Sequence, residues 1–235
     1  MDAVRNDYLN ALKFWDEGYV PKPDAEEKTI TPDTDCADLA YSRQLALWIG
    51  EQLSGRTRVL DYGCGKGWAG LLLAKRGCPC VTAVEISQNA VQEALKLKKA
   101  LALGDNYNAL HIDEAWLSRQ ESGVYDGIVS TNVLDVIPPD VAENILREMA
   151  RVLSPDGKVL INMNYYMEPK DNPEKNTVIR HGNHVYLNGI LRMVTRTDEE
   201  WAQIFSRYFK VESCTYYAWN VEETARRRSF VLRPL

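Results

Sequence analysis

The sequence predicts an α/β protein with a doubly wound, mostly parallel sheet. Between residues 57 and 164, short and nearly continuous apolar runs alternate with helical segments, a pattern typical of parallel strands covered by helices on both faces. A glycine-rich turn containing Gly63, Gly65 and Gly67 follows the first of these runs. Right-handed crossovers place the loops that follow such strands at one edge of the sheet, where ligands bind.

Helices are expected before this core. Apolar residues recur at helical spacing over about residues 3–16, and Gly18 is a plausible stop. Several prolines then oppose regular helix, so residues 19–33 are expected to form an extended crossing segment. Asp35 is the predicted N-cap of a second helix that continues to Leu53.

The core is expected to alternate strand and helix. The predicted order is strand 59–61, helix 69–76, strand 81–85, a helix capped by Ser87 to about 103, strands 109–112 and 127–130, a helix begun by Pro138, and strand 159–163. We predict one domain of 235 residues with an N-terminal helical segment at 1–54, a cofactor-binding core at 57–164, an inserted meander at 165–196 and a closing unit at 197–235.

The inserted segment breaks the alternation. Three β-prone runs, at 177–180, 184–187 and 190–194, predict an antiparallel β-meander, and the last two are joined by an Asn-Gly hairpin signal. A capping box at Thr197 predicts the next helix. The runs 210–217 and 229–233 then predict a closing antiparallel pair of strands, with the basic run 226–228 as a solvated turn.

Composition indicates a soluble enzyme. No apolar run approaches the roughly 18 residues that span a bilayer, and the chain begins without a secretory pattern. The five cysteines are scattered and lack ligand spacing, so we expect reduced thiols, no metal site and a cytoplasmic location. The net charge of −5 opposes a nucleic-acid partner.

The glycine-rich turn predicts a nucleoside-containing cofactor. Glycine adopts positive φ and lets a ligand lie against backbone amides at the start of the following helix, where the helix dipole favours an electron-rich group. Glu85 ends the second apolar run, where an acid can accept hydrogen bonds from ribose hydroxyls. Dinucleotide enzymes usually carry a G-x-G-x-x-G pattern, but here Trp68 stands where its third glycine belongs, which opposes an NAD-dependent dehydrogenase.

The motif at residues 58–67 resembles the first motif of class I S-adenosylmethionine-dependent methyltransferases. Residues 125–134 are similar to the family's fourth strand, and residues 153–161 to its turn into strand five. The resemblance covers about 57–164 firmly and 197–233 more loosely. It implies a seven-stranded sheet of order 3-2-1-4-5-7-6 with the seventh strand antiparallel, and S-adenosyl-L-methionine as the cofactor.

The resemblance and the glycine turn together give a set of expected cofactor-binding residues. These are Asp61, Gly63, Cys64, Gly65, Gly67, Glu85, Ile86, Asp113, Glu114, Thr131 and Asn132. Asp61 either contacts the methionyl amine or orients the glycine loop. Asp113 is expected near the adenine amino group, with Glu114 as the alternative. His111 is expected to be a buried strand residue bonded to backbone.

Methyl transfer mainly requires alignment of an acceptor with the sulfonium methyl, so no nucleophilic triad is expected. The catalytic residues are not identified by the sequence; Tyr165, Tyr166 and His184 are candidates for the acceptor site. We expect methyl transfer to a small-molecule acceptor. The alternatives are a peptide or protein methyltransferase, or a catalytically silent cofactor-binding regulator. The N-terminal helix and the meander are expected either to close over the cofactor as a lid, or to extend the sheet edge or assemble a dimer.

Overall fold

A seven-stranded sheet forms the centre of the protein. The computed structural model describes residues 3–20 and 29–235. Its sheet has the order β3-β2-β1-β4-β5-β10-β9. The strands are β1 (Arg58–Tyr62), β2 (Cys80–Glu85), β3 (Tyr107–His111), β4 (Tyr125–Thr131), β5 (Leu153–Met163), β9 (Phe209–Tyr217) and β10 (Arg227–Pro234). Strand β10 is antiparallel to both of its neighbours, which confirms the order implied by the resemblance.

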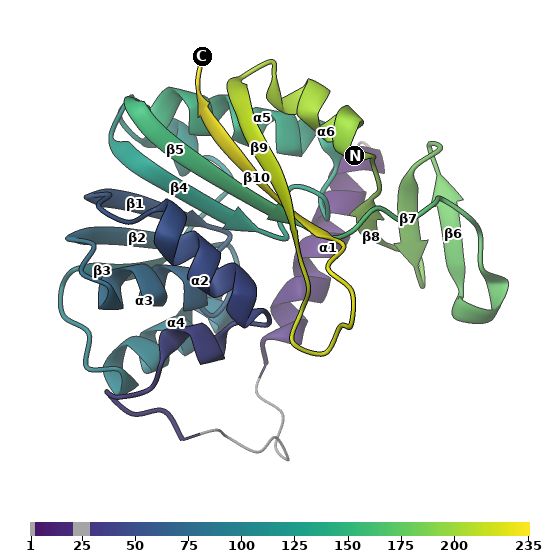
Figure 1. Cartoon of the computed structure of the whole chain (residues 1–235). Helices are drawn as coiled ribbons and strands as arrows, with labels where there is room; N and C mark the ends of the chain where they lie inside the picture. The colour runs from purple at the N-terminus through teal and green to yellow at the C-terminus, as the bar shows by residue number, and fades with distance from the viewer. Residues whose placement is uncertain (1–2, 21–28) are drawn as a thin grey trace.

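Helices cover both faces of the sheet (Figure 1). They are α1 (Ala3–Gly18), α2 (Arg43–Gln52), α3 (Trp68–Lys75), α4 (Gln88–Ala100), α5 (Pro139–Val152) and α6 (Asp198–Phe205). Apolar side chains of α2, α3 and α4 form one core with the sheet, and those of α5 and α6 form the other. Within the described residues, no helix is long and apolar enough to cross a membrane.

The central strands are apolar on both faces because each face packs against helices. Val59 and Leu60 are adjacent in β1, and both are fully buried in opposite cores. Burying an aliphatic side chain of this size contributes about 1.5–3 kcal/mol. The same apolar residues therefore form the strand and fill both cores. The strands β1, β2 and β4 are parallel, so their carboxyl ends lie at one edge of the sheet.

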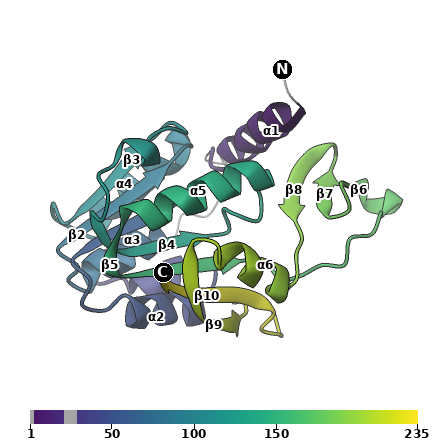
Figure 2. The ribbon, with the colours of Figure 1, turned by 90° about the horizontal axis from the view of Figure 1, so that it is seen from above.

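The meander forms a second, separate sheet of three antiparallel strands, as predicted. Its strands are β6 (Thr177–Arg180), β7 (His184–Leu187) and β8 (Ile190–Val194). The meander therefore does not extend the edge of the central sheet. Figure 1 shows α1 between the central sheet and the meander, and α1 lies beside β8 in both views (Figures 1 and 2).

Helix α1 is joined to the meander by polar and aromatic contacts. The Tyr186 hydroxyl donates a hydrogen bond to the carboxylate of Asp7. The guanidinium carbon of Arg192 lies 3.9 Å from the ring centroid of Phe14 and 5.2 Å from that of Trp15. A cation over an aromatic face contributes about 0.5–2 kcal/mol per pair. These contacts hold α1 and the meander together, although the two segments are far apart in the sequence.

Two predictions about local structure are wrong. Asp35 caps a short 3-10 helix, Cys36–Leu39, and α2 begins only after Ser42, whose hydroxyl accepts the amide hydrogen of Leu45. The expected solvated turn at 226–228 is also wrong for two of its residues, because Arg227 and Arg228 are 5% and 1% exposed within β10. The predicted crossing segment at 19–33 lies partly outside the described residues.

Candidate active site

The glycine loop between β1 and α3 needs a backbone that only glycine adopts readily. Gly63, Gly65 and Gly67 have φ values of 67°, 53° and 79°, all in the left-handed region. The amides of Gly63 and Cys64 donate to the Val84 carbonyl at 2.9 and 3.0 Å, so the loop is tied to β2. Burial raises the pKa of the Cys64 thiol well above its usual range, and this side chain therefore stays neutral.

Asp61 lies in β1, one residue before the strand ends, and is buried. Its Oδ2 accepts the amide hydrogen of Gly70 at 2.8 Å, which fixes the first turn of α3. Burial raises the pKa of Asp61 to about 7; the Gly70 hydrogen bond opposes this rise, and the charge of Glu85 adds to it. The geometry matches the orienting role, and contact with the methionyl amine stays a prediction.

Glu85 ends β2 and joins two loops. Its Oε2 accepts the amide hydrogen of Gly65 at 2.9 Å, and its Oε1 accepts those of Ile86 and Ser87 at 2.8 and 3.0 Å. Charge-assisted bonds of this kind are about twice as strong as neutral ones. The half-buried carboxylate is therefore held beside the glycine loop, where a ribose ligand is expected from the sequence.

The acids after β3 point to different partners. Asp113 is exposed and ion-paired to Arg119 at 2.7 Å. Glu114 pairs with Arg5 of α1 and lines a cavity of about 450 Å³ with Tyr8 and residues of α5. Glu114 is thus the acid that meets a cavity, and the assignment of either acid to adenine stays a prediction.

His111 differs from its predicted environment. Its Nε2 lies 3.1 Å from the Ile86 carbonyl oxygen, which matches the expected backbone partner. The imidazole is exposed rather than buried, because β3 is the edge strand of the sheet. The Ile86 amide, in turn, is bonded to Glu85.

The carboxyl end of β4 carries a strained asparagine. Asn132 has a φ of 56°, and its amide donates to the Asn162 carbonyl at 2.8 Å. The side-chain amide of Asn162 donates to the Thr131 hydroxyl at 3.0 Å. Among the described residues, the Oδ1 atoms of Asn132 and Asn162 are buried and accept no hydrogen bond. Buried polar atoms of this kind are usually satisfied, so these oxygens are candidates for a bound group or water.

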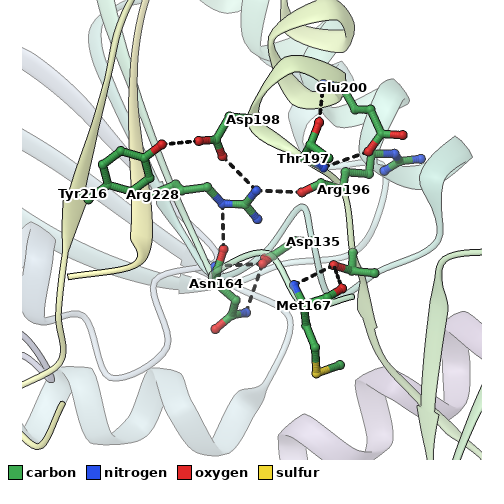
Figure 3. A network of polar contacts seen from close by, with 10 residues as sticks. Asp135, Asn164, Met167, Arg196, Thr197, Asp198, Glu200, Tyr216 and Arg228 are labelled. Atoms are coloured by element: carbon green, nitrogen blue, oxygen red, sulfur yellow. Dashed lines mark hydrogen bonds and ion pairs between the residues drawn. The ribbon is translucent and has the colours of Figure 1, made fainter. Parts of the chain in front are cut away.

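A buried polar network behind this loop was not foreseen from the sequence (Figure 3). Oδ2 of Asp135 accepts hydrogen bonds from the backbone and side-chain amides of Asn164 at 2.8 and 3.0 Å. The Arg228 guanidinium donates to the carbonyls of Asn164 and Arg196 and to Oδ1 of Asp198. Burial raises the pKa of Asp135, and the Asn164 amide and the Arg228 charge oppose this rise. The loops after β4 and β5 are thereby fixed to α6 and β10.

The three candidate acceptor residues do not form one cluster. Tyr165 is half-buried below Arg226, whose guanidinium carbon is 4.6 Å from the ring centroid. Tyr166 is largely exposed. His184 lies in the meander, where its ring contacts His181 and burial, followed by the charges of His181 and Arg196, lowers its pKa.

Tyr19 is a site residue that the sequence reading did not assign to the cofactor. Its hydroxyl lies over the glycine loop, and a β-carbon on Gly65 would stand 2.6 Å from it. Nearby, the Asp16 carboxylate accepts hydrogen bonds from the Ser87 hydroxyl at 2.6 Å and the Asn89 amide at 3.3 Å. The end of α1 therefore covers the glycine loop and the start of α4. Its sequence signal is weak, because an aromatic residue just past a helix is common in any fold.

A family profile described as "Methyltransferase domain" matches residues 59–157. A ubiquinone biosynthesis O-methyltransferase of Neisseria meningitidis is 27% identical over 107 residues, covering 45% of this chain and 43% of that protein. A ribosomal protein L11 methyltransferase of Dechloromonas aromatica is 32% identical over 101 residues, covering 42% and 32%. The chain thus spans less than half the length of these two relatives.

Solved structures share the whole fold at low identity. The Burkholderia thailandensis 1,6-didemethyltoxoflavin-N1-methyltransferase, solved with its acceptor and S-adenosylhomocysteine, has a TM-score of 0.73 at 16% identity, covering 100% of this chain and 91% of that one. The Synechocystis magnesium protoporphyrin IX methyltransferase, solved with S-adenosylmethionine, has a TM-score of 0.64 at 16% identity, covering 99% and 100%. Residues 59–157 thus match a methyltransferase domain, and the whole chain has the fold of these two S-adenosylmethionine-dependent methyltransferases.

Proposed function

We propose that this protein transfers the methyl group of S-adenosylmethionine to a small-molecule acceptor. The observation that carries the proposal is the meeting of three left-handed glycines, Asp61 and Glu85 at one sheet edge, beneath the end of α1. At Gly65 the left-handed backbone favours glycine, and a β-carbon would stand 2.6 Å from the Tyr19 hydroxyl, so the loop suits a ligand that lies directly against it.

The cofactor supplies an activated methyl group when it is bound. The carboxylate of Glu85 would hold the ribose, and the glycine loop would lie against the methionyl end. Asp61 keeps α3 aligned with the loop. The side-chain oxygen of Asn132 is unpartnered among the described residues and is a positioning group for the acceptor or the cofactor. The protein would contribute mainly by aligning the acceptor with the methyl group and by excluding water.

Helix α1 and the meander form the lid of the proposed site. Helix α1 covers the glycine loop through Tyr19 and is tied to the meander through Asp7 and Tyr186. We infer that α1 and the meander respond together to the cofactor and shape the acceptor site. A site roofed in this way suits a small molecule better than a folded protein surface, which would have to displace both segments.

Methylation of a peptide or protein is the second candidate. It is favoured by the several curated relatives named as ribosomal protein L11 methyltransferases. The relative from Laribacter hongkongensis is 23% identical over 194 residues, which cover 77% of this chain and 52% of that protein. A silent cofactor-binding regulator would differ from both in lacking turnover.

Calorimetry with S-adenosylhomocysteine and with NAD tests the cofactor first. We expect S-adenosylhomocysteine to bind and NAD not to bind. Comparable affinity for NAD would contradict the proposal. Labelled S-adenosylmethionine incubated with metabolite extracts and, separately, with ribosomal protein then distinguishes small-molecule, protein and silent functions.

Hydrogen exchange tests the lid. Adding S-adenosylhomocysteine should slow exchange at the glycine loop and also at residues 8–20 and 177–194. Protection confined to residues 61–70 and the neighbourhood of Glu85 would remove the lid from the proposal and leave the cofactor site in place.

A further inference from the structure

Arg192 of β8 is a cation without a counter-ion in the described part of the chain. Its side chain is half-buried, and among the described residues it forms no hydrogen bond and no ion pair. Burial lowers the pKa of Arg192, and no nearby described charge acts against this shift. Removing a charge from water is costly, so charges at this depth are normally paired. An anion from outside the chain would supply the missing partner.

The guanidinium of Arg192 is held by two aromatic rings. As described above, it lies against the rings of Phe14 and Trp15. Packing of this kind uses the faces of the planar group and leaves the N–H groups at its edge for a ligand. Nε is fully buried, whereas the two Nη atoms are not, and they too donate to no described residue. The guanidinium is therefore fixed in orientation while its edge stays accessible.

A second donor without an acceptor lies beside Arg192. The indole nitrogen of Trp15 is buried and donates to no atom among the described residues. Buried donors usually have a partner, and here two of them meet in the contact between α1 and β8. A carboxylate or phosphate has enough lone pairs to accept several hydrogen bonds at once. The contact is therefore suited to an oxyanion.

Strand β8 joins this contact to the loop after β4. The amide of Val194, two residues beyond Arg192, donates to the Asp135 carbonyl at 2.7 Å. The same loop begins at Asn132, whose buried side-chain oxygen accepts no hydrogen bond from the described residues. Among those residues, no hydrogen bond joins the meander to the glycine loop. Arg192 is therefore assigned to the acceptor and not to the methionyl carboxylate of the cofactor.

Helix α1 joins the contact to the expected ribose site. Trp15 precedes Asp16, whose carboxylate accepts the hydrogen bond of the Ser87 hydroxyl at 2.6 Å. The Ser87 amide in turn donates to Glu85 at 3.0 Å. The turn of α1 that packs on Arg192 is thus bonded to the loop that follows β2. Arg192 lies where the lid meets the carboxyl edge of the sheet.

We propose that the methyl acceptor carries an oxyanion, a carboxylate or a phosphate, which pairs with Arg192 at the junction of α1, β8 and the loop after β4. This inference rests on the proposed function, since it names the chemical class of the acceptor at the same site. Arg192 selects the acceptor and takes no part in methyl transfer itself.

The test compares anions with a neutral analogue on nitrogen-15-labelled protein saturated with S-adenosylhomocysteine. Benzoate, phenyl phosphate and benzamide are titrated by NMR, and the indole N–H signal of Trp15, assigned with Trp15→Phe, reports binding beside Arg192. We expect at least one anion to move this signal and to bind at least about tenfold more tightly than benzamide, as hydrogen bonds between charged groups imply. The tighter of the two anions identifies the oxyanion.

Variants of Arg192 test the pairing directly. Arg192→Gln should remove the preference for the anion. Arg192→Lys keeps a cation over the rings without the planar fork, so it should keep part of the preference, and it decides the matter if Arg192→Gln does not fold. Arg180→Gln is the matched control, because Arg180 also lies in the meander with its guanidinium carbon 4.4 Å from the ring centroid of Tyr186. It should leave the preference intact.

The outcomes separate this inference from the proposed function. Failure of S-adenosylhomocysteine to bind would count against the proposed function. If S-adenosylhomocysteine binds, the acceptor assignment alone is overturned by equal affinity for anions and benzamide, by no binding of either anion at millimolar concentration, or by binding that leaves the Trp15 signal unmoved. Loss of S-adenosylhomocysteine affinity in both Arg192 variants would also overturn it, by placing Arg192 on the cofactor.

Discussion

The hydroxyl of Tyr19 lies over Gly65, 2.6 Å from the place that a β-carbon at that position would take. Gly65 also donates its amide hydrogen to Glu85, so the loop is contacted from above by α1 and from the side by β2. A cofactor bound in this loop would meet both side chains. We therefore expect cofactor binding to be coupled to the position of Tyr19, which directly follows α1.

Gly65→Ala should abolish measurable S-adenosylhomocysteine binding. The methyl group meets the Tyr19 hydroxyl, and the left-handed φ costs about 1–2 kcal/mol for a residue with a β-carbon. Gly55→Ala is the matched control, since Gly55 has a φ of 75° with nothing within 4 Å of its added β-carbon. Calorimetry should show normal binding in the control. Urea unfolding should show the loss of stability from the left-handed φ in both variants, with a further loss in Gly65→Ala from the contact with Tyr19. Retained binding by Gly65→Ala would contradict the placement of the loop.

Asp61 should make stability depend on pH. Because burial raises its pKa in the folded protein to about 7, the neutral form is favoured by folding. The stabilisation is complete below the unfolded pKa near 4 and is lost as pH rises through 7. Between pH 5 and 8 the free energy of unfolding should fall by about 2–3 kcal/mol more in the wild type than in Asp61→Asn. Urea unfolding at both pH values measures this difference, and equal slopes would show that Asp61 is already ionised.

Glu85→Gln should weaken S-adenosylhomocysteine binding by about 1–3 kcal/mol, the range for hydrogen bonds to a charged group. The amide keeps one acceptor oxygen for the neighbouring backbone, so thermal stability should fall less than after Glu85→Ala. Glu121→Gln, an exposed change at a residue between β3 and β4, is the control and should leave binding unchanged. Unaltered affinity in a folded Glu85→Gln would remove this residue from the ribose site.

Arg228→Met should lower the free energy of unfolding by about 2–4 kcal/mol. The change leaves the carbonyls of Asn164 and Arg196 without a donor and removes the cation that opposes the raised pKa of Asp135. Arg207→Met removes an exposed ion pair instead and should cost less than about 1 kcal/mol. Chemical denaturation of the two variants side by side measures the contrast. Equal small effects would mean that the network adds little stability.

Local patterns were enough to predict the glycine loop and the edge of the sheet at which it lies. The glycine spacing, the acid at the end of β2 and the alternation of strands with helices are all short-range features, and the sheet order follows the family resemblance. The same reasoning was wrong for the start of α2, because Asp35 and Ser42 are both good N-caps. The extended backbone at Ala40 separates the two turns, and periodicity does not reveal that break.

Long-range partners explain the other differences. A run of three arginines is usually solvated, but here Glu222 and Asp198 neutralise the two that enter β10. Neither partner is signalled by the basic run itself. Likewise, the helix at residues 3–18 was predicted, while the contact of Tyr19 with the glycine loop depends on where that helix lies across the sheet.

The bond between Tyr186 and Asp7, with Arg192 packed on Phe14 and Trp15, makes the first helix and the insertion interdependent. An attempt to exchange the insertion between related proteins would therefore have to exchange residues 3–18 and 177–194 together. In a chimera that exchanges only the insertion, Asp7, Phe14 and Trp15 of α1 would face side chains from the other protein. Sequence drift in either segment is subject to the same constraint, so substitutions at Asp7 and Tyr186 are expected to arise in compensating pairs.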